Sequence, residues 1–252
     1  MKTAIFIPAR ISSTRLPNKP LLEIKGKPVI EHLIERMKSA KLPDIVVLCT
    51  TNSPEDEKLV KLAQKNKIKY FRGSEKDILE RYLGAAMKYD IDFIVNVDGD
   101  DILCDPEYVD KTIDIFIKKN PDVVKWEGLP FGAAPLGIKV SALKKVYNEK
   151  DVDDTETGWG LYFTKNKKLS VEILQADSTV RYPEIRMSLD YPEDFVFFNK
   201  IFEELCAPGK NMSLPDIITF LKSNPQIIKI NEGLQEKYLK RFKKMSVKVK
   251  SN

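Results

Sequence analysis

Four short apolar segments alternate with helical patterns over the first hundred residues of the chain. They are rich in β-branched and aromatic residues, and they cover residues 3–7, 45–49, 68–71 and 93–97. Apolar runs of this length are typical of strands buried on both faces of a parallel sheet. A helical pattern follows each run, and repeated strand–helix units build parallel sheets through right-handed crossovers. The sequence therefore predicts an α/β fold, with a mostly parallel mixed sheet flanked by helices.

The second half of the chain has a less regular pattern. Strands are expected at 123–126, 138–140, 169–174 and 184–189, and the last two alternate apolar with polar residues. Such alternation is typical of antiparallel or mixed parts of a sheet. Helices are expected at 105–119, 192–205, 213–223 and 234–244, in addition to one at 29–39 in the first half of the chain. With no linker or repeat between these elements, we expect one domain over residues 1–252 with a small antiparallel segment.

The loop after the first strand is basic and follows directly on a proline. Pro8 ends the strand because it has no N–H to donate, and Arg10, Arg15 and Lys19 follow within eleven residues. The carboxyl ends of parallel strands are where α/β sheets bind ligands. Fixed cations with small hydroxyl residues between them suit a polyphosphate. The alternative is an ordinary solvated basic loop.

Acidic residues follow two of the expected strands. Asp98, Asp100 and Asp101 come directly after the strand at 93–97, and Asp190 comes directly after the one at 184–189. Clustered carboxylates are costly unless a cation lies between them, and Mg²⁺ is held by carboxylates together with substrate phosphates. We therefore predict a Mg²⁺ site formed by Asp100 and Asp190, facing the basic loop. An exposed Asp-Gly turn is the alternative for the first cluster taken alone.

The charge of the chain is uneven. The net charge is +5, but from residue 236 onward there are seven Lys or Arg residues and one acidic residue. The remainder is close to neutral, which argues against nucleic acid as a partner. We interpret the basic C-terminal tail from about residue 236 as a solvated helix end; a membrane or nucleic-acid anchor is the rarer alternative.

Cysteine and histidine usage excludes several kinds of site. The three cysteines are widely spaced without a CxxC motif, so a disulfide framework or zinc site is not expected, and Cys49 is interpreted as a core residue. His32 is the only histidine, which excludes His-based triads; we expect it on the surface or facing a partner. The sequence shows no secretory leader and no apolar run of about 18 residues, so we expect a cytoplasmic protein with no membrane partner.

Several motifs resemble one enzyme family. Residues 8–36 (PARISSTRLPNKPLLEIKGKPVIEHLIER), 95–101 (VNVDGDD) and 189–197 (LDYPEDFVF) resemble cytidylyltransferases that activate acidic sugars, such as 3-deoxy-manno-octulosonate cytidylyltransferases. Residues 50–63 and 71–86 are similar to the spore-coat polysaccharide SpsF-type branch. The resemblance implies a nucleotide-diphospho-sugar transferase (Rossmann-like) fold. It also implies transfer of CMP from CTP to an acceptor with release of pyrophosphate, dependent on Mg²⁺ and carried out by a homodimer.

The resemblance also implies roles for individual residues. Arg10, Arg15 and Lys19 would be the catalytic cations that hold the triphosphate, and Asp100 and Asp190 would hold the metal. The other implied nucleotide contacts are Pro8, Ala9, Ser13, Thr14, Thr50, Arg72, Ser74, Asp77, Arg81 and Asp98. Relatives often carry Gln at the position of Asp98. Residues 50–52 (Thr-Thr-Asn) stand where an Asp often follows the second strand, a departure that favours the spore-coat branch.

The acceptor side is the least constrained by the motifs. By resemblance, residues 127–182 would be an acceptor-binding or dimerisation insert, and the acceptor a sugar acid or a phosphorylated sugar or polyol, used in surface polysaccharide or glycan synthesis. Such an acceptor needs a further cation, for which Lys139, Arg181 and Arg186 are candidates. Each is equally compatible with a solvated strand position. Two other functions stay open: a nucleotide-sugar-dependent glycosyltransferase, and a non-catalytic nucleotide-binding homologue.

Overall fold

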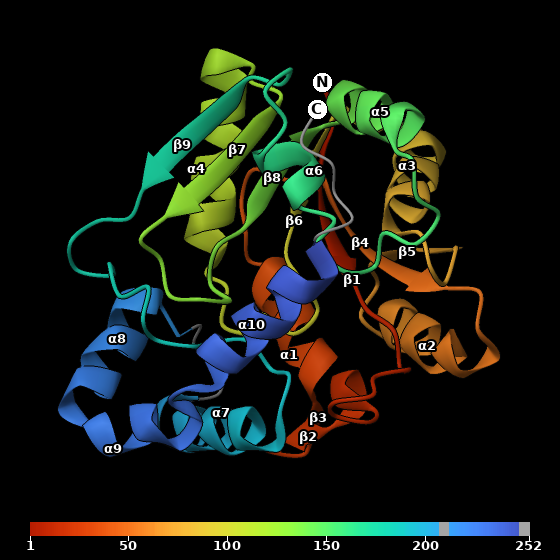
Figure 1. The fold of residues 1–252 in the computed structure, drawn as a ribbon. Helices are drawn as coiled ribbons and strands as arrows, with labels where there is room; N and C mark the ends of the chain where they lie inside the picture. The colour runs from red at the N-terminus through yellow and green to blue at the C-terminus, as the bar shows by residue number, and fades with distance from the viewer. Residues whose placement is uncertain (207–211, 247–252) are drawn as a thin grey trace.

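A seven-stranded sheet runs through the centre of the molecule (Figure 1). The structure is a computed structural model that describes residues 1–206 and 212–246, with side chains up to Phe242. The strand order is β5-β4-β1-β6-β8-β7-β9. The strands are β1 (Thr3–Pro8), β4 (Ile45–Thr51), β5 (Lys69–Gly73), β6 (Phe93–Asn96), β7 (Val123–Glu127), β8 (Leu136–Lys139) and β9 (Val171–Gln175). Strand β8 is antiparallel to β6 and β7, and the other neighbouring pairs are parallel. The predicted fold class is confirmed.

Helices cover both faces of the sheet because alternate residues of each strand point to opposite sides. In β1, Ile5 and Ile7 face one buried cluster, and Ala4 and Phe6 face the other. The first cluster is completed by α1 (Val29–Met37), α2 (Glu57–Lys65), α4 (Pro106–Lys119), α7 (Pro192–Leu205) and α8 (Leu214–Ser223). The second is completed by α3 (Ile78–Tyr89), α5 (Val140–Glu149) and α6 (Leu161–Thr164).

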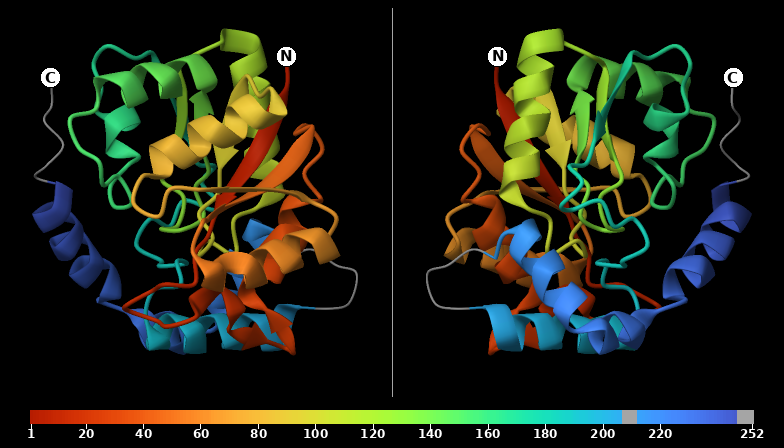
Figure 2. Two further views of the ribbon diagram at one scale, coloured as in Figure 1. Left: turned by 90° about the vertical axis from the view of Figure 1, so that its right-hand side faces the viewer. Right: turned by 90° about the vertical axis from the view of Figure 1, so that its left-hand side faces the viewer.

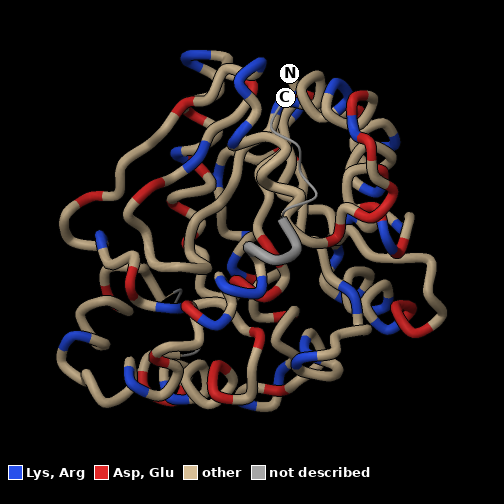
Figure 3. Tube along the Cα trace, viewed as in Figure 1, with Lys and Arg blue, Asp and Glu red and all other residues tan. Residues whose placement is uncertain are grey.

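The remaining elements are short or lie outside the two main layers. A small hairpin joins β2 (Glu23–Ile24) to β3 (Lys27–Pro28), and α9 (Pro225–Ile228) follows α8. Helix α10 (Leu234–Ser246) stands apart from α7, α8 and α9, along one side of the molecule (Figure 2). Lys and Arg residues and Asp and Glu residues are both spread over the traced chain (Figure 3). Within the described ranges, we find no helix that combines the length and the apolar character needed to cross a bilayer.

Two expectations about secondary structure and burial are wrong. Residues 184–189 do not form a strand: their one β-bridge joins Arg186 to Phe131, and the Leu189 N–H donates instead to the Asp100 carbonyl oxygen. The alternating pattern instead reflects the burial of Ile185, Met187 and Leu189 in the core. His32 is not on the surface: its Nε2 lies 2.8 Å from the Ile24 carbonyl oxygen, and its ring packs 4.6 Å from that of Phe202.

Residues 127–182 are part of the central sheet. This range contributes β8, which lies between β6 and β7, and β9, which forms one edge. Without β8, strands β7 and β9 would not be joined to β6 and the rest of the sheet. The range is therefore an integral part of the domain and not an insert. Its role in binding an acceptor or a second subunit stays a prediction.

Candidate functional site

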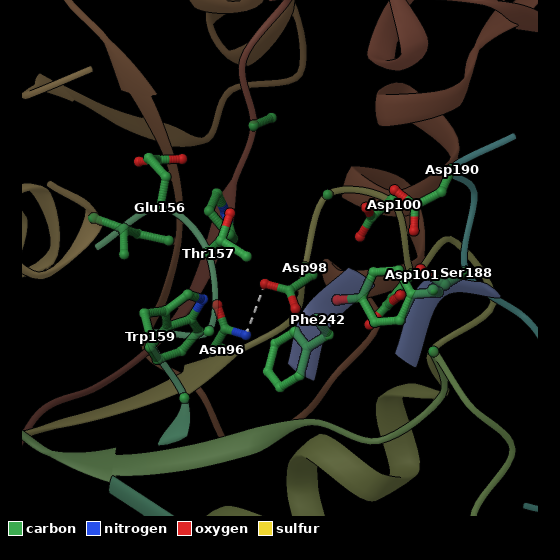
Figure 4. Close-up of a pocket in the computed structure, with 18 of the residues that line it drawn as sticks. Asn96, Asp98, Asp100, Asp101, Glu156, Thr157, Trp159, Ser188, Asp190 and Phe242 are labelled. Atoms are coloured by element: carbon green, nitrogen blue, oxygen red, sulfur yellow. Dashed lines mark hydrogen bonds between the residues drawn. The ribbon is translucent and has the colours of Figure 1, made fainter. Parts of the chain in front are cut away.

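A cavity of about 650 Å³ opens at the carboxyl ends of β1 and β6. Its walls come from the loop after β1, the acidic turn after β6, residues 129–136, residues 156–164, the segment from Ser188 to Asp190, and helix α10. Figure 4 shows Asp100 and Asp190 together on one side, Glu156, Thr157 and Trp159 on the other, and the Asp98 carboxylate between the two groups. This is the position at which the sequence predicted a ligand.

The basic loop is pinned to the sheet by backbone hydrogen bonds. The Ala9 N–H donates to the Cys49 carbonyl oxygen at 3.2 Å, and the Ile11 N–H donates to the Asp56 carboxylate at 2.8 Å. Asp56 is itself buried and accepts a second bond from the Thr51 N–H. The loop therefore holds its shape through a carboxylate from the neighbouring β4–α2 connection.

Two cations of the loop, Arg15 and Lys19, reach carboxylates from distant parts of the chain. The Lys19 ammonium lies 2.6 Å from Asp100 and 3.1 Å from Asp190, and Arg15 forms an ion pair with Asp190. Burial lowers the pKa of Lys19, but the two carboxylates outweigh it and the net shift is upward. Burial likewise opposes the charged form of Asp190, but the adjacent cations lower its pKa overall. The predicted convergence of Arg15, Lys19, Asp100 and Asp190 is confirmed.

The acidic turn is shaped by a close backbone contact at Gly99. Its N–H donates to the Pro8 carbonyl oxygen at 3.1 Å, and a Cβ at this position would lie 2.5 Å from that same oxygen. Glycine is therefore required for the turn to press against β1. The contact places Asp98 and Asp100 on either side of the turn, facing the cavity.

The carboxylates of this turn are close enough to hold a cation. Oxygens of Asp98, Asp100 and Asp101 lie within 4.8 Å of one another. Burial and the charge of Asp100 raise the pKa of Asp98 to about 7. Oxygen ligands on a crowded acidic turn fit a hard divalent ion such as Mg²⁺, and Lys19 shows that a cation is accommodated between Asp100 and Asp190.

The loop that carries Asp190 is held by Asp194, which is completely buried. The Asp194 carboxylate accepts hydrogen bonds from the backbone N–H groups of Asp190 and Tyr191 and pairs with Arg186 at 2.9 Å. A side-chain N–H of Asn231 donates to it as well, at 2.9 Å. Asp190 is thus presented by a network that the sequence did not reveal.

The far wall of the cavity contains an acidic residue between two arginines. Glu156 lies 2.7 Å from Arg81 and 3.6 Å from Arg10. The segment that carries it is anchored by Thr155, whose hydroxyl donates to Asp77 at 2.7 Å. Asp77 also caps helix α3 by accepting from the N–H groups of its first turn. Asp77 therefore positions the wall without lining it.

Most of the predicted nucleotide residues line the cavity. Those that do are Pro8, Ala9, Arg10, Ser13, Thr14, Arg15, Lys19, Arg81 and Asp98, together with the predicted metal ligands Asp100 and Asp190.

Four predicted nucleotide residues lie behind the cavity wall. Arg72 donates to the carbonyl oxygens of Thr51 and Ser53 and pairs with Glu57, so its guanidinium ties β4, β5 and α2 together. Thr50 is completely buried within the sheet. The Ser74 hydroxyl accepts from two backbone N–H groups just before α3, and Asp77 accepts from two in the first turn of α3. None of these four side chains lines the cavity, so the structure does not place them for direct contact. Arg72, Ser74 and Asp77 are engaged by neighbouring segments, whereas the buried Thr50 hydroxyl has no hydrogen-bond partner among the described residues.

The three acceptor candidates are also not at the cavity. Lys139 pairs in register with Phe93, at the start of β6, so it lies at the opposite end of the sheet. Arg181 donates to the Ala176 carbonyl oxygen, and Arg186 is buried against Asp190 and Asp194. The structure therefore does not place Lys139, Arg181 or Arg186 where an acceptor in this cavity could reach them.

Helix α10 forms a wall of the cavity that the sequence did not reveal. Tyr238, Arg241 and Phe242 line the cavity, so the described part of the basic tail is not simply a solvated helix end. The Tyr238 ring lies 5.6 Å from the guanidinium carbon of Arg15 and 5.2 Å from the Phe131 ring. Two aromatic residues four positions apart in a lysine-rich helix mark a buried face, and that spacing is the signal that could have revealed it.

Comparison with known proteins identifies the family. The sequence model of the cytidylyltransferase family matches residues 4–202. The spore coat polysaccharide biosynthesis protein SpsF of Bacillus subtilis is 25% identical over 226 residues, covering 87% of this chain and 94% of that protein. The 3-deoxy-manno-octulosonate cytidylyltransferase of Brucella suis is 38% identical over 152 residues, covering 52% of this chain and 59% of that protein.

A solved structure agrees with these relatives over nearly the whole chain. A cytidylyltransferase from Leptospira borgpetersenii superposes with a TM-score of 0.83 at 28% identity, covering 90% of this chain and 97% of that one. The resemblance seen in the motifs of the first loop and the two acidic segments is confirmed. The chain belongs to the cytidylyltransferase family.

Proposed function

We propose that the protein transfers CMP from CTP to an oxygen of a sugar acid or of a phosphorylated sugar or polyol, releasing pyrophosphate. The observation that carries this proposal is the contact of one ammonium, that of Lys19, with both Asp100 and Asp190. It brings the cations of the β1 loop and the carboxylates of two distant segments to one point, where a triphosphate and its counter-ion would meet. The name of SpsF supports a product used in polysaccharide synthesis, and the name of the Brucella enzyme supports a sugar acid as the acceptor.

The residues of the site have separate tasks in this reaction. Arg10, Arg15 and Lys19 bind the β- and γ-phosphates and offset the charge that develops on pyrophosphate as it leaves. The bond from the acceptor oxygen to the α-phosphorus forms as the bond to the β-phosphate oxygen breaks. Asp100 and Asp190, with Asp98 beside them, would hold Mg²⁺, which supplies charge neutralisation at the phosphate oxygens when bound. The walls of the cavity orient the two substrates, which lowers the entropic cost of bringing them together.

A pyrophosphate-release screen tests the proposal. The four ribonucleoside triphosphates are each combined with sugar acids, aldose phosphates, polyol phosphates and neutral sugars, with Mg²⁺ or with a chelator. We expect release with CTP and an acidic acceptor, and its loss in the chelator. Release from nucleotide sugars, or no release with any pair, would contradict the proposed reaction.

The Asp100→Asn substitution tests the carboxylate turn directly. Because the substitution weakens a carboxylate that would hold Mg²⁺ against the phosphates, we expect turnover to fall by about a hundredfold or more while the fold is retained. Asp114→Asn is the matched control, since Asp114 pairs with Lys118 on the surface of α4, away from the cavity. Turnover near that of the wild type in the Asp100 variant would remove this residue from the mechanism.

A further inference from the structure

One face of helix α10 is turned toward the cavity. Gln235, Tyr238, Arg241 and Phe242 follow helical spacing and so lie on the same side of the helix. The Gln235 amide donates to the Pro183 carbonyl oxygen at 3.3 Å, and Tyr238 packs on Phe131. At the other end of this face, a Cβ on Gly158 would lie 3.5 Å from the Phe242 ring, so the ring closely covers that backbone. The helix is therefore seated on the cavity by contacts along its length.

The cations of the cavity differ in whether the protein already neutralises them. Arg10 and Arg81 are next to Glu156, Arg15 pairs with Asp190, and Lys19 pairs with Asp100 and Asp190. Arg241 also lines the cavity, and it has no carboxylate partner among the residues whose side chains are described. Its charge is therefore available to a bound anion.

The cavity wall beside Arg241 is largely apolar and aromatic, which suits a sugar ring better than a phosphate group. Its neighbour Phe242 covers Gly158, and the cavity wall there continues through Trp159 to Leu161 and Thr164. Figure 4 shows the rings of Phe242 and Trp159 directed into the cavity that Asp98 also faces. Ring faces offer apolar contact area to the C–H groups of a sugar, while the triphosphate is served by the three cations of the β1 loop.

We propose that Arg241 is the specificity-determining residue for the acceptor: its guanidinium binds the carboxylate or phosphate group of the acceptor, while Phe242 packs against the carbon skeleton. This proposal rests on the proposed function and adds to it the group that selects acidic acceptors. It replaces Lys139, Arg181 and Arg186, whose side chains are not at the cavity. A guanidinium suits both anions because its N–H groups bind two oxygens at once.

Three variants of the full-length protein test the assignment: Arg241→Ala, Arg241→Lys and, as the matched control, Lys240→Ala. Lys240 is the adjacent cation of α10 and pairs with Glu236 on the exposed side of the helix. CTP affinity is measured by titration without acceptor. Michaelis constants are then measured with 3-deoxy-manno-octulosonate as the carboxylate probe, ribitol 5-phosphate as the phosphate probe, and a neutral sugar alcohol.

The Arg241→Ala variant should raise the Michaelis constant for the charged acceptor about ten- to hundredfold, because a charge-assisted hydrogen bond is lost. CTP affinity should not change, Arg241→Lys should retain part of the effect, and Lys240→Ala should match the wild type. The two charged probes show whether carboxylate or phosphate is the preferred group. Discrimination against the neutral acceptor should shrink in Arg241→Ala.

The outcomes separate this inference from the function on which it rests. If the wild-type protein releases no pyrophosphate from CTP with any acceptor, the proposed function fails and the acceptor assignment fails with it. If the wild type is active and Arg241→Ala keeps its acceptor constant, or weakens CTP instead, only the role of Arg241 is overturned. Thermal melting of each variant excludes a loss of fold as the cause.

Discussion

The two sides of the cavity are built on different principles. On the phosphate side, the lining cations of the β1 loop already contact carboxylates of the protein, as Lys19 does with Asp100 and Asp190. On the side formed by α10, the described wall offers the rings of Tyr238 and Phe242 and the unpaired guanidinium of Arg241. On the first side, a phosphate group must replace a protein carboxylate as the partner of each cation. The second is a surface on which a substrate can lie without displacing an ion pair.

This difference shows where binding energy and stability come from in each part. Ion pairs with buried members, such as Arg186 with Asp194, are costly to break because the remaining charge stays out of water. Aromatic side chains at the edge of a cavity contribute contact area that a variant can lose without exposing a buried charge. Substitutions on the phosphate side should therefore have the larger effects, on stability as well as on activity.

The largest effect is expected for Asp194→Ala. The substitution leaves Arg186 buried without its main partner and removes the acceptor for the backbone N–H groups of Asp190 and Tyr191. Loss of one member of a buried ion pair costs about 3–5 kcal/mol in the free energy of unfolding. Chemical denaturation measures this change, with the exposed neighbour Glu193→Ala as the control. Equal stability of the two variants would show that the network does not support the site.

An intermediate effect is expected for Lys19→Ala. The ammonium no longer meets the triphosphate, so the Michaelis constant for CTP should rise about tenfold or more, as for the loss of a charge-assisted contact. The free energy of unfolding should fall less than in Asp194→Ala, because Lys19 and Asp100 are both partly exposed. Steady-state kinetics at fixed acceptor concentration give the constant, and Lys58→Ala, on the exposed surface of α2, is the control. An unchanged constant for CTP would argue against the loop as the phosphate site.

The smallest effect is expected for Phe242→Leu on the opposite side. Leucine keeps apolar contact with Gly158 but loses the flat ring face, so the Michaelis constant for the acceptor should rise only a few-fold. The constant for CTP should stay the same. Leu239→Ala, at an exposed position of the same helix, serves as the control. A larger effect on CTP than on the acceptor would reverse the assignment of the two sides.

The phosphate side was the more predictable part because its signals are local in the sequence. Residues 8–19 and 98–101 each follow an apolar strand directly, and strand ends of a parallel sheet meet at one edge. The pairing of Arg15 with Asp190, 175 positions apart, followed from that rule. The prediction succeeded although residues 184–189 are not a strand, because their buried alternation still brings Asp190 to the same edge.

Ligand contacts were wrongly predicted for arginines whose guanidinium groups bind oxygen atoms of the protein itself. Arg72 and Arg186 carry the charge that a nucleotide or an acceptor would need, yet each is occupied by oxygens of neighbouring segments. His32 was expected at the surface, but the hairpin of β2 and β3 and the ring of Phe202 enclose it. A sequence shows which groups a residue carries, but not which partners fold against it.

By itself, the sequence determined most of the order of strands and helices, the basic loop, the two acidic segments and their meeting at one edge of the sheet. These features depend on local periodicity and on the geometry of parallel sheets, which act over short stretches of chain. Only the tertiary structure decided that β8 lies inside the sheet, that Asp194 holds Asp190 in place, and that α10 closes the cavity. Those features depend on contacts between residues far apart in sequence. Such contacts stabilise the protein only after folding has brought the residues together in its interior.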